Sequence, residues 1–273
     1  MQRDSIDFSS SDVGKLFRRF LFPTVMGMAF SAVFVITDGI LVGRGIGSDA
    51  LASVNIVAPL FTLGTGLGLM FGMGGSVVAS INLAQDKRRV AEINITQSLA
   101  LPALLIALLS ALLIHCHKPL LMLLGTPGEL MVPAREYLVW FTLFLAPLAV
   151  FNILMFIVRL DGAPGFAMAC NIMAACINIA LDYLFIFVFE WGLGGAAVAT
   201  GIGYVVGSGV MLWYMFRRSR TLRFVKLKIS GKSMRLTVRN LWYMSYIGFP
   251  ALLSELAISC LMIVGNYTFI HYV

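Results

Sequence analysis

Long apolar stretches separated by short polar ones run along the whole chain. A stretch of about 20 apolar residues is long enough to cross a bilayer as an α-helix. We count seven such stretches and find no strict alternation of the kind that forms a membrane β-barrel. They lie at about 17–42, 53–80, 95–116, 132–158, 165–189, 193–216 and 242–270. The sequence therefore predicts an all-α, polytopic membrane protein.

These stretches divide the chain into four predicted segments. The polar segment 1–16 lacks the apolar core and the cleavage site of a signal peptide, so the first helix is expected to remain as an anchor. The first six helices form a predicted bundle over 17–216. A basic linker, 217–241, leads to the seventh helix, 242–273.

The composition supports this class of protein. Hydrophobic residues make up 59% of the chain and charged residues 12%, whereas a soluble domain carries about 25% charged residues. Basic residues in short loops favour the cytoplasmic side of a membrane. With a cytoplasmic N-terminus, 17 of the 20 Lys and Arg residues lie inside, and the others are Arg44, Lys118 and Arg135. We expect a multi-pass protein of the cytoplasmic (inner) membrane, oriented in this way.

The linker 217–241 holds nine of these basic residues. Such a cluster can bind nucleic acid, but this one directly follows a membrane helix. We therefore interpret it as a cytoplasmic anchor beside anionic lipid headgroups. No nucleic-acid partner is expected.

Several kinds of chemistry are disfavoured by the motifs that the chain lacks. Its four cysteines form no CxxC pair and are expected to be reduced thiols. His115, Cys116 and His117 are adjacent, so their side chains diverge around a helix and make a poor metal site. No GxxxxGK[ST] motif is present. We expect a protein that is not an enzyme and has no cofactor, and any pumping would use an ion gradient or a partner's ATPase.

Glycines and prolines are expected to shape the helices. Gly64, Gly68 and Gly72 repeat at four-residue spacing, as do Gly203 and Gly207. Small residues at this spacing allow membrane helices to approach closely. Prolines within or near the apolar stretches favour kinks, because each one removes a backbone donor.

The candidate chemistry lies in polar residues inside the apolar stretches. A carboxylate at the bilayer centre costs about 2.5–3.5 kcal/mol and therefore usually marks an ion or substrate path. Asp38 and Asp182 are such residues, and Asn178 precedes Asp182 by one helical turn on the same face. In the predicted orientation, Thr200 returns to a similar depth in the outer half of the bundle. These oxygen ligands suit Na⁺ or proton exchange rather than soft metals.

A simpler interpretation is that these polar groups only hold helices together by hydrogen bonds. For Thr200 the two interpretations are equally favoured. For Asn178, and more strongly for the aspartates, a cation or proton site is favoured.

Several stretches resemble motifs of the MATE (multidrug and toxic compound extrusion) family, and the resemblance covers nearly the whole chain. Two stretches resemble the first-helix motif of the family: TDGILVGRGIG (37–47) and LASVN (51–55). Three more resemble its fourth-to-sixth-helix signature: RLDGAP (159–164), NIALDYLFIF (178–187) and WGLGGAAVAT (191–200). The stretch GFPALLSEL (248–256) is similar to the seventh helix of the bacterial multidrug branch with VmrA-like and MepA-like pumps.

The resemblance implies an antiporter that exports small organic, often cationic, compounds in exchange for Na⁺ or H⁺. Asp38, Asn178, Asp182 and Thr200 match the cation site of the family's N-terminal lobe, where Na⁺ is a possible bound metal. Pro23 matches a proline at which the first helix bends. Glu255 occupies an acidic position in helix seven that is implied to contribute to the cavity or to coupling.

Family members have twelve helices in two pseudo-symmetric lobes. The repeat is visible at its start, because Phe249-Pro250 opens helix seven as Phe22-Pro23 opens helix one. The resemblance therefore implies a six-helix N-terminal lobe followed by the first helix of a truncated second lobe. We expect the chain to be a fragment, with the missing second lobe supplied in the full-length protein.

Two alternative functions remain from the sequence. A lipid-linked oligosaccharide flippase of the same superfamily would have more basic residues in its cavity, whereas Asp38, Asp182 and Glu255 are acidic. A seven-helix receptor usually has its N-terminus outside, opposite to the orientation predicted from the basic residues.

Overall fold

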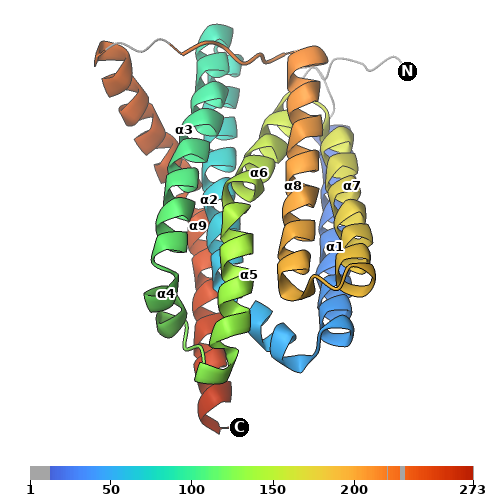
Figure 1. Ribbon diagram of the computed structural model, residues 1–273. Helices are drawn as coiled ribbons and strands as arrows, with labels where there is room; N and C mark the ends of the chain where they lie inside the picture. Colours follow the sequence, from blue (N-terminus) through green and yellow to red (C-terminus); the bar gives the residue numbers. More distant parts are fainter. Residues whose placement is uncertain (1–12, 220, 228–230, 273) are drawn as a thin grey trace.

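The computed structural model of the protein describes residues 13–219, 221–227 and 231–272, and it is a bundle of roughly parallel and antiparallel helices (Figure 1). Their bounds are α1 Val13–Gly45, α2 Ser48–Ala84, α3 Arg88–His115, α4 His117–Leu123, η1 Gly128–Leu130, α5 Met131–Leu143, α6 Leu145–Leu160, α7 Pro164–Tyr183, η2 Leu184–Val188, α8 Gly192–Arg217 and α9 Gly231–Tyr272.

The described helices confirm the predicted all-α membrane fold. Six of them are long and apolar enough to cross a membrane, and the bent pair α5 and α6 makes a seventh candidate span. The predicted segment 1–16 lies mostly outside the described residues, although α1 already begins at Val13.

The predicted fourth span, 132–158, corresponds to the bent pair α5 and α6, which together make one candidate span. It is interrupted at Phe144, where α5 and α6 meet at a bend of 46°. Pro147 explains the break, because its ring nitrogen cannot donate to the carbonyl of Leu143 and its ring disfavours a helical carbonyl four residues earlier. The apolar pattern continues through the bend, and the bend agrees with the expectation that prolines in these stretches favour kinks.

Two further boundaries differ from the prediction. The helix α9 begins at Gly231, so the second half of the predicted linker 217–241 is helical. The short helix α4 follows α3 directly and was not predicted. Both differences arise because the apolar pattern marks the part of a helix inside a bilayer and misses polar ends and short helices.

The order of the helices in space positions the cavity described below. Figure 1 shows α1, α7 and α8 together on one side and α3, α4 and α9 on the other, with α2, α5 and α6 between them. Accordingly, α1 packs on α7, α7 on α8, and α2 on both α6 and α9. Of the candidate spans, α2 is the most buried, and α1 and α9 are the least.

One end of the bundle gathers the basic segments. The turn from α2 to α3, the turn from α6 to α7 and the segment from α8 to α9 all lie at this end, which we call the basic end (Figure 1). It includes Lys87, Arg88 and Arg89 at the start of α3 and Arg217 at the end of α8. This agrees with the one-sided distribution of charge in the sequence, although which side faces the cytoplasm stays a prediction.

The glycine repeats pack as predicted. A Cβ atom on Gly68 would lie 3.0 Å from the backbone of Ala149, and one on Gly72 would lie 3.0 Å from the Cα atom of Ile153. The glycine face of α2 therefore touches the backbone of α6. Gly203 likewise brings α8 against the carbonyl of Ala174 on α7, where a Cβ would lie 2.9 Å from the oxygen. These approaches hold the helices that carry the polar residues in fixed register.

Candidate functional site

The helices α1, α7 and α8 bring together the residues that the sequence singled out. Asp182 is fully buried, and Asn178 and Thr200 are 2% and 8% exposed. Asn178 and Thr200 are joined by a side-chain contact of 3.0 Å. With its amide oxygen toward Thr200, Asn178 accepts from Thr200 N at 2.8 Å and donates from its amide nitrogen to Asp182 Oδ2 at 3.1 Å. This orientation satisfies both ends of the amide.

Asp38 completes this cluster from α1. A side-chain hydrogen bond joins its carboxyl group to that of Asp182. Such a bond requires that one of the two groups carries a proton, because two carboxylates can only accept. The second oxygens, Asp38 Oδ1 and Asp182 Oδ1, are buried and have no hydrogen-bond partner among the described residues. We call Asp38, Asn178, Asp182 and Thr200 the acidic cluster.

Two tyrosines near the acidic cluster were not predicted. Tyr137 of α5 is close enough to Asp38 and Asp182 to interact with both electrostatically, and Tyr204 of α8 is close to Asp38. Tyr204 follows Thr200 by one helical turn and so lies on the same face, which the sequence could have indicated. For Tyr137 no local pattern gives such a signal, because α5 reaches the cluster only through the fold.

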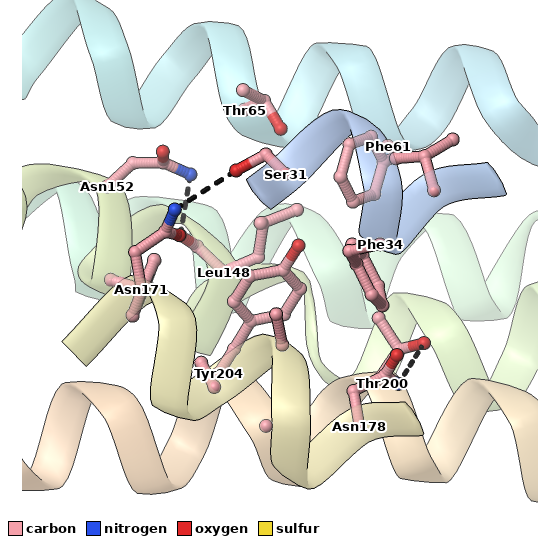
Figure 2. Close-up of a pocket in the computed structure, with 15 residues that line it drawn as sticks. Ser31, Phe34, Phe61, Thr65, Leu148, Asn152, Asn171, Asn178, Thr200 and Tyr204 are labelled. Carbon is pink, nitrogen blue, oxygen red and sulfur yellow. Dashed lines mark hydrogen bonds between the residues drawn. The ribbon is translucent and has the colours of Figure 1, made fainter. Parts of the chain in front are cut away.

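A cavity of about 220 Å³ lies beside the acidic cluster, between α1, α2, α6, α7 and α8. Asn178 and Thr200 form part of its wall, and Figure 2 shows Tyr204 between them and a second polar group. In that second group, Asn171 donates to Ser31 Oγ at 3.0 Å and to Gly27 O at 3.1 Å, which ties α7 to α1.

Polar residues of this wall and of the acidic cluster share a spacing that was not predicted from the sequence. Ser31 precedes Asp38 by seven residues, and Asn171 precedes Asn178 by seven. Seven residues are almost two helical turns, so each pair lies on one face of its helix. The repeated spacing on α1 and α7 marks the two faces that enclose the cavity.

The remaining predicted residues lie elsewhere. Glu255 is on α9, where its Cβ atom would be 2.9 Å from a Cβ built on Gly66 of α2. Glu255 is not part of the wall of the cavity. Pro23 lies within α1, but its side chain is outside the described residues. The structure therefore brings four of the six predicted residues together and leaves the roles implied for Glu255 and Pro23 as predictions.

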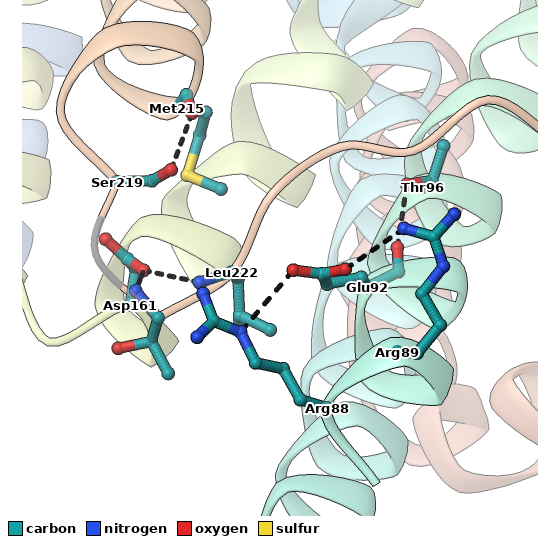
Figure 3. A network of polar contacts seen from close by, with 9 residues as sticks. Arg88, Arg89, Glu92, Thr96, Asp161, Met215, Ser219 and Leu222 are labelled. Atoms are coloured by element: carbon teal, nitrogen blue, oxygen red, sulfur yellow. Dashed lines mark hydrogen bonds and ion pairs between the residues drawn. The ribbon is translucent and has the colours of Figure 1, made fainter.

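A second buried aspartate, Asp161, lies at the basic end and was not selected from the sequence, although it belongs to the RLDGAP stretch. Its Oδ1 atom accepts from the backbone nitrogens of Thr221 at 2.9 Å and Leu222 at 3.1 Å, and its Oδ2 atom accepts from Tyr214 Oη at 2.9 Å. Figure 3 shows this carboxylate against the segment that follows α8. Asp161 therefore holds that segment on the end of the bundle.

The acidic cluster has the donor set of a site for a hard cation. Carboxyl, amide and hydroxyl oxygens suit Na⁺, and the unpartnered carboxyl oxygens of Asp38 and Asp182 are available as ligands. Among the described residues no group of three or more His, Cys, Asp or Glu side chains could hold a metal ion. A transition-metal centre is therefore not supported in this part of the chain.

Comparisons with known proteins find relatives of this chain. The chain is 30% identical over 267 residues to the multidrug export protein MepA of Staphylococcus saprophyticus, an alignment that covers 95% of this chain and 56% of that protein. MepA of Staphylococcus aureus strain MRSA252 is 28% identical over 274 residues, which cover 97% of this chain and 58% of that protein. The chain thus spans little more than half the length of these relatives.

The fold has counterparts among solved structures. One is described as the outward-facing conformation of a multidrug resistance MATE family transporter of the MOP superfamily. It matches with a TM-score of 0.82 and 24% identity, over 96% of this chain and 57% of that one. A family model described as MatE matches residues 23–184, which include Asp38, Asn178 and Asp182. Since this match covers more than half of the sequence, the chain belongs to the MatE family, whose members are membrane transporters and not enzymes.

Proposed function

We propose that the protein acts in the export of small organic, often cationic, compounds across the cytoplasmic membrane, driven by Na⁺ or H⁺ exchange at the acidic cluster. The observation that carries this proposal is the contact between Asp38 and Asp182, whose second oxygens are buried without a protein partner. The relatives are named multidrug export proteins, which supports the substrate class.

The chemistry of coupling follows from the two carboxyl groups. Two negative charges in contact repel each other strongly in an apolar environment, so the pair needs a proton or a cation between its members. A shared proton is replaced when Na⁺ binds to the free oxygens, or is released when the pair opens to water. Asn178 orients Asp182 through its amide, and Thr200 fixes Asn178 in turn. The cluster can therefore exist in two discrete states that differ by one bound ion.

The cavity next to the cluster suits an organic cation. Its wall combines the aromatic rings of Phe34, Phe61 and Phe151 with amide and hydroxyl groups, and none of its residues is basic. Aromatic faces attract cations, and the nearest charged groups are the acidic Asp38 and Asp182. A flippase for lipid-linked oligosaccharides would need basic groups for the phosphates, so this alternative is less well supported. Membership of the MatE family excludes the receptor alternative.

The orientation belongs to the same proposal. We place the basic end of the bundle in the cytoplasm, because Lys and Arg are retained on that side. Substrate would then enter the cavity from the basic end and leave at the opposite end, while the ion moves inward. Labelling of a cysteine placed beside Lys87 by an impermeant reagent should occur only after the membrane is opened. Labelling in intact cells contradicts this orientation.

The proposed coupling is tested by efflux of ethidium from cells that produce the protein. Asp38→Asn and Asp182→Asn should each reduce gradient-driven efflux to the background of cells without the protein, because the exchanging carboxyl pair is lost. Asp49→Asn is the matched control, since Asp49 is an exposed aspartate at the start of α2, and it should leave efflux unchanged. The amount of each variant in the membrane fraction is measured in parallel. Unchanged efflux in both cluster variants, at equal amounts of protein, rules out the proposed coupling.

A further inference from the structure

A groove separate from the cavity lies between the N-terminal parts of α3 and α9. It has a volume of about 510 Å³ and is formed on one side by Asn94 and Gln97 of α3 and on the other by Arg239, Asn240 and Trp242 of α9. Figure 1 shows the beginning of α9 diverging from α3 toward the basic end. Both candidate spans, Arg88–His115 and Arg235–Thr268, begin here, so the groove opens near the level where apolar helix meets polar headgroups.

The floor of the groove is a chain of amides. Asn240 donates from its amide nitrogen to Asn94 Oδ1 at 2.8 Å and to Gln97 Oε1 at 2.6 Å, and Gln97 donates to Thr237 Oγ1 at 2.7 Å. These bonds hold Asn94 with its Nδ2 atom as the free donor. That nitrogen is buried and has no partner among the described residues, although Asn94 is only 3% exposed. An unpaired buried donor costs about 1–3 kcal/mol, so an acceptor from outside the chain is expected there.

The rim of the groove combines a cation with amphipathic aromatic rings. Arg239 is exposed and makes no ion pair with another described residue. Trp242 and Tyr243 are 75% and 50% exposed, and such residues are typical of the boundary between lipid tails and headgroups. Glu92, a nearby acidic residue of α3, is paired with Arg88 at 3.5 Å and Arg89 at 3.4 Å. The groove itself therefore presents positive charge and donors without a compensating carboxylate.

We propose that this groove binds the headgroup of an anionic phospholipid. The phosphate oxygens accept from Asn94 Nδ2 and from the guanidinium group of Arg239, a side chain whose fork of donors suits phosphate. Trp242 and Tyr243 lie against the glycerol region, and the acyl chains follow the exposed apolar surface near Val90. This lipid bridges α3 to the start of α9. The site is independent of the acidic cluster and of the ion that the cluster exchanges.

Native mass spectrometry of the purified protein in detergent tests the proposal, with phosphatidylglycerol, phosphatidylcholine and inorganic phosphate as separate probes. Phosphatidylglycerol should bind with one retained molecule per chain, and phosphatidylcholine and inorganic phosphate should bind at least about tenfold more weakly, because one lacks net charge and the other lacks acyl chains. Arg239→Gln and Asn94→Asp should each weaken phosphatidylglycerol binding about tenfold. Asn94→Asp keeps the oxygen that Asn240 contacts and replaces the free donor by a charged acceptor oxygen, which repels a phosphate.

Arg235→Gln is the matched control, because Arg235 is exposed one turn before Arg239 and does not line the groove. Arg235→Gln should change phosphatidylglycerol binding by less than about twofold. If only the diffuse positive charge of the surface attracted the lipid, Arg235→Gln and Arg239→Gln would weaken binding equally. Equal losses in Arg235→Gln and Arg239→Gln overturn the proposal. So does binding of inorganic phosphate as tight as that of phosphatidylglycerol, which indicates a free-anion site. If Asn94→Asp fails to fold, judged by size exclusion and circular dichroism, the exposed Arg239 and its control decide the outcome.

Discussion

Asp161 and Asp182 are both aspartates buried near the ends of apolar helices, yet their carboxyl groups have opposite surroundings. Asp161, which is 6% exposed, accepts hydrogen bonds at both oxygens from two backbone nitrogens and a tyrosine. Asp182, which is fully buried, contacts another carboxyl group and leaves Oδ1 without a partner among the described residues. Burial alone therefore does not identify a functional carboxylate in this bundle.

The hydrogen bonds of each group indicate its role. A carboxylate with satisfied oxygens stabilises the fold in one arrangement, and Asp161 accordingly fastens the segment after α8 to the basic end (Figure 3). A carboxyl group with a free oxygen gains from binding a proton or a cation. The following predictions test this difference between a structural and an exchanging aspartate.

The largest stability effect is expected at Asp161. Asp161→Ala removes the acceptor of the buried Leu222 nitrogen and the buried Tyr214 hydroxyl, and of the nitrogen of the exposed Thr221. Each orphaned buried donor costs about 1–3 kcal/mol. We expect the free energy of unfolding in mixed detergent micelles to fall by about 3 kcal/mol. Asp182→Asn should leave it within about 1 kcal/mol of the original, because the amide keeps the shape of the side chain and replaces a buried acid whose Oδ1 atom has no partner among the described residues. An equal loss in both variants contradicts the distinction.

Two tyrosines provide a matched test of intermediate size. Tyr214→Phe removes a hydrogen bond to a charged group and should lower the free energy of unfolding by about 1.5 kcal/mol. Tyr204 forms no hydrogen bond to another described residue and lines the cavity. Tyr204→Phe should therefore change stability by less than about 0.5 kcal/mol, as for a substitution away from a buried network. The affinity of the Tyr204→Phe variant for ethidium should instead fall a few-fold, as measured by fluorescence titration. A large loss of stability in Tyr204→Phe, with little loss in Tyr214→Phe, would show that Tyr204 is structural.

A loss of stability smaller than that at Tyr214 is expected for a polar residue of the cavity wall. Asn171 lines the cavity, but its amide nitrogen donates to Gly27 O and Ser31 Oγ of α1. Asn171→Ala should lower the free energy of unfolding by about 1 kcal/mol, the net value of a neutral hydrogen bond, and should change ethidium efflux little.

Asn152→Ala is the control for that substitution. Asn152 also lines the cavity, but its amide nitrogen donates to Leu148 O within the same helix at 3.0 Å. Its removal should affect stability less than removal of the bond between α1 and α7. A larger effect at Asn152 than at Asn171 would show that the bond between helices contributes little.

The sequence predicted much of the acidic cluster because its signals are local. Asn178 and Asp182 share a helix face because they are four residues apart. The basic residues of the loops predict the orientation of the helices, which places Asp38 and Thr200 at a similar depth. Tyr137 could not be found in this way, since it reaches the cluster from α5 across a bend that the apolar pattern does not show. Glu255 differs from these residues: it is an acidic residue in an apolar helix that lies outside the cavity wall, and the role implied for it stays a prediction.

The apolar stretches alone determined that the chain crosses a membrane as helices, because hydrophobicity and helical periodicity are properties of neighbouring residues. The tertiary structure decided which oxygens remain without partners, and so separated Asp182 from Asp161. That outcome depends on contacts between helices far apart in sequence, such as Asp38 with Asp182 and Asp161 with Leu222. Asp38 reaches Asp182 because α1 packs on α7, and Asp161 reaches Leu222 because α6 packs on α8 and the segment after α8 lies over the end of α6.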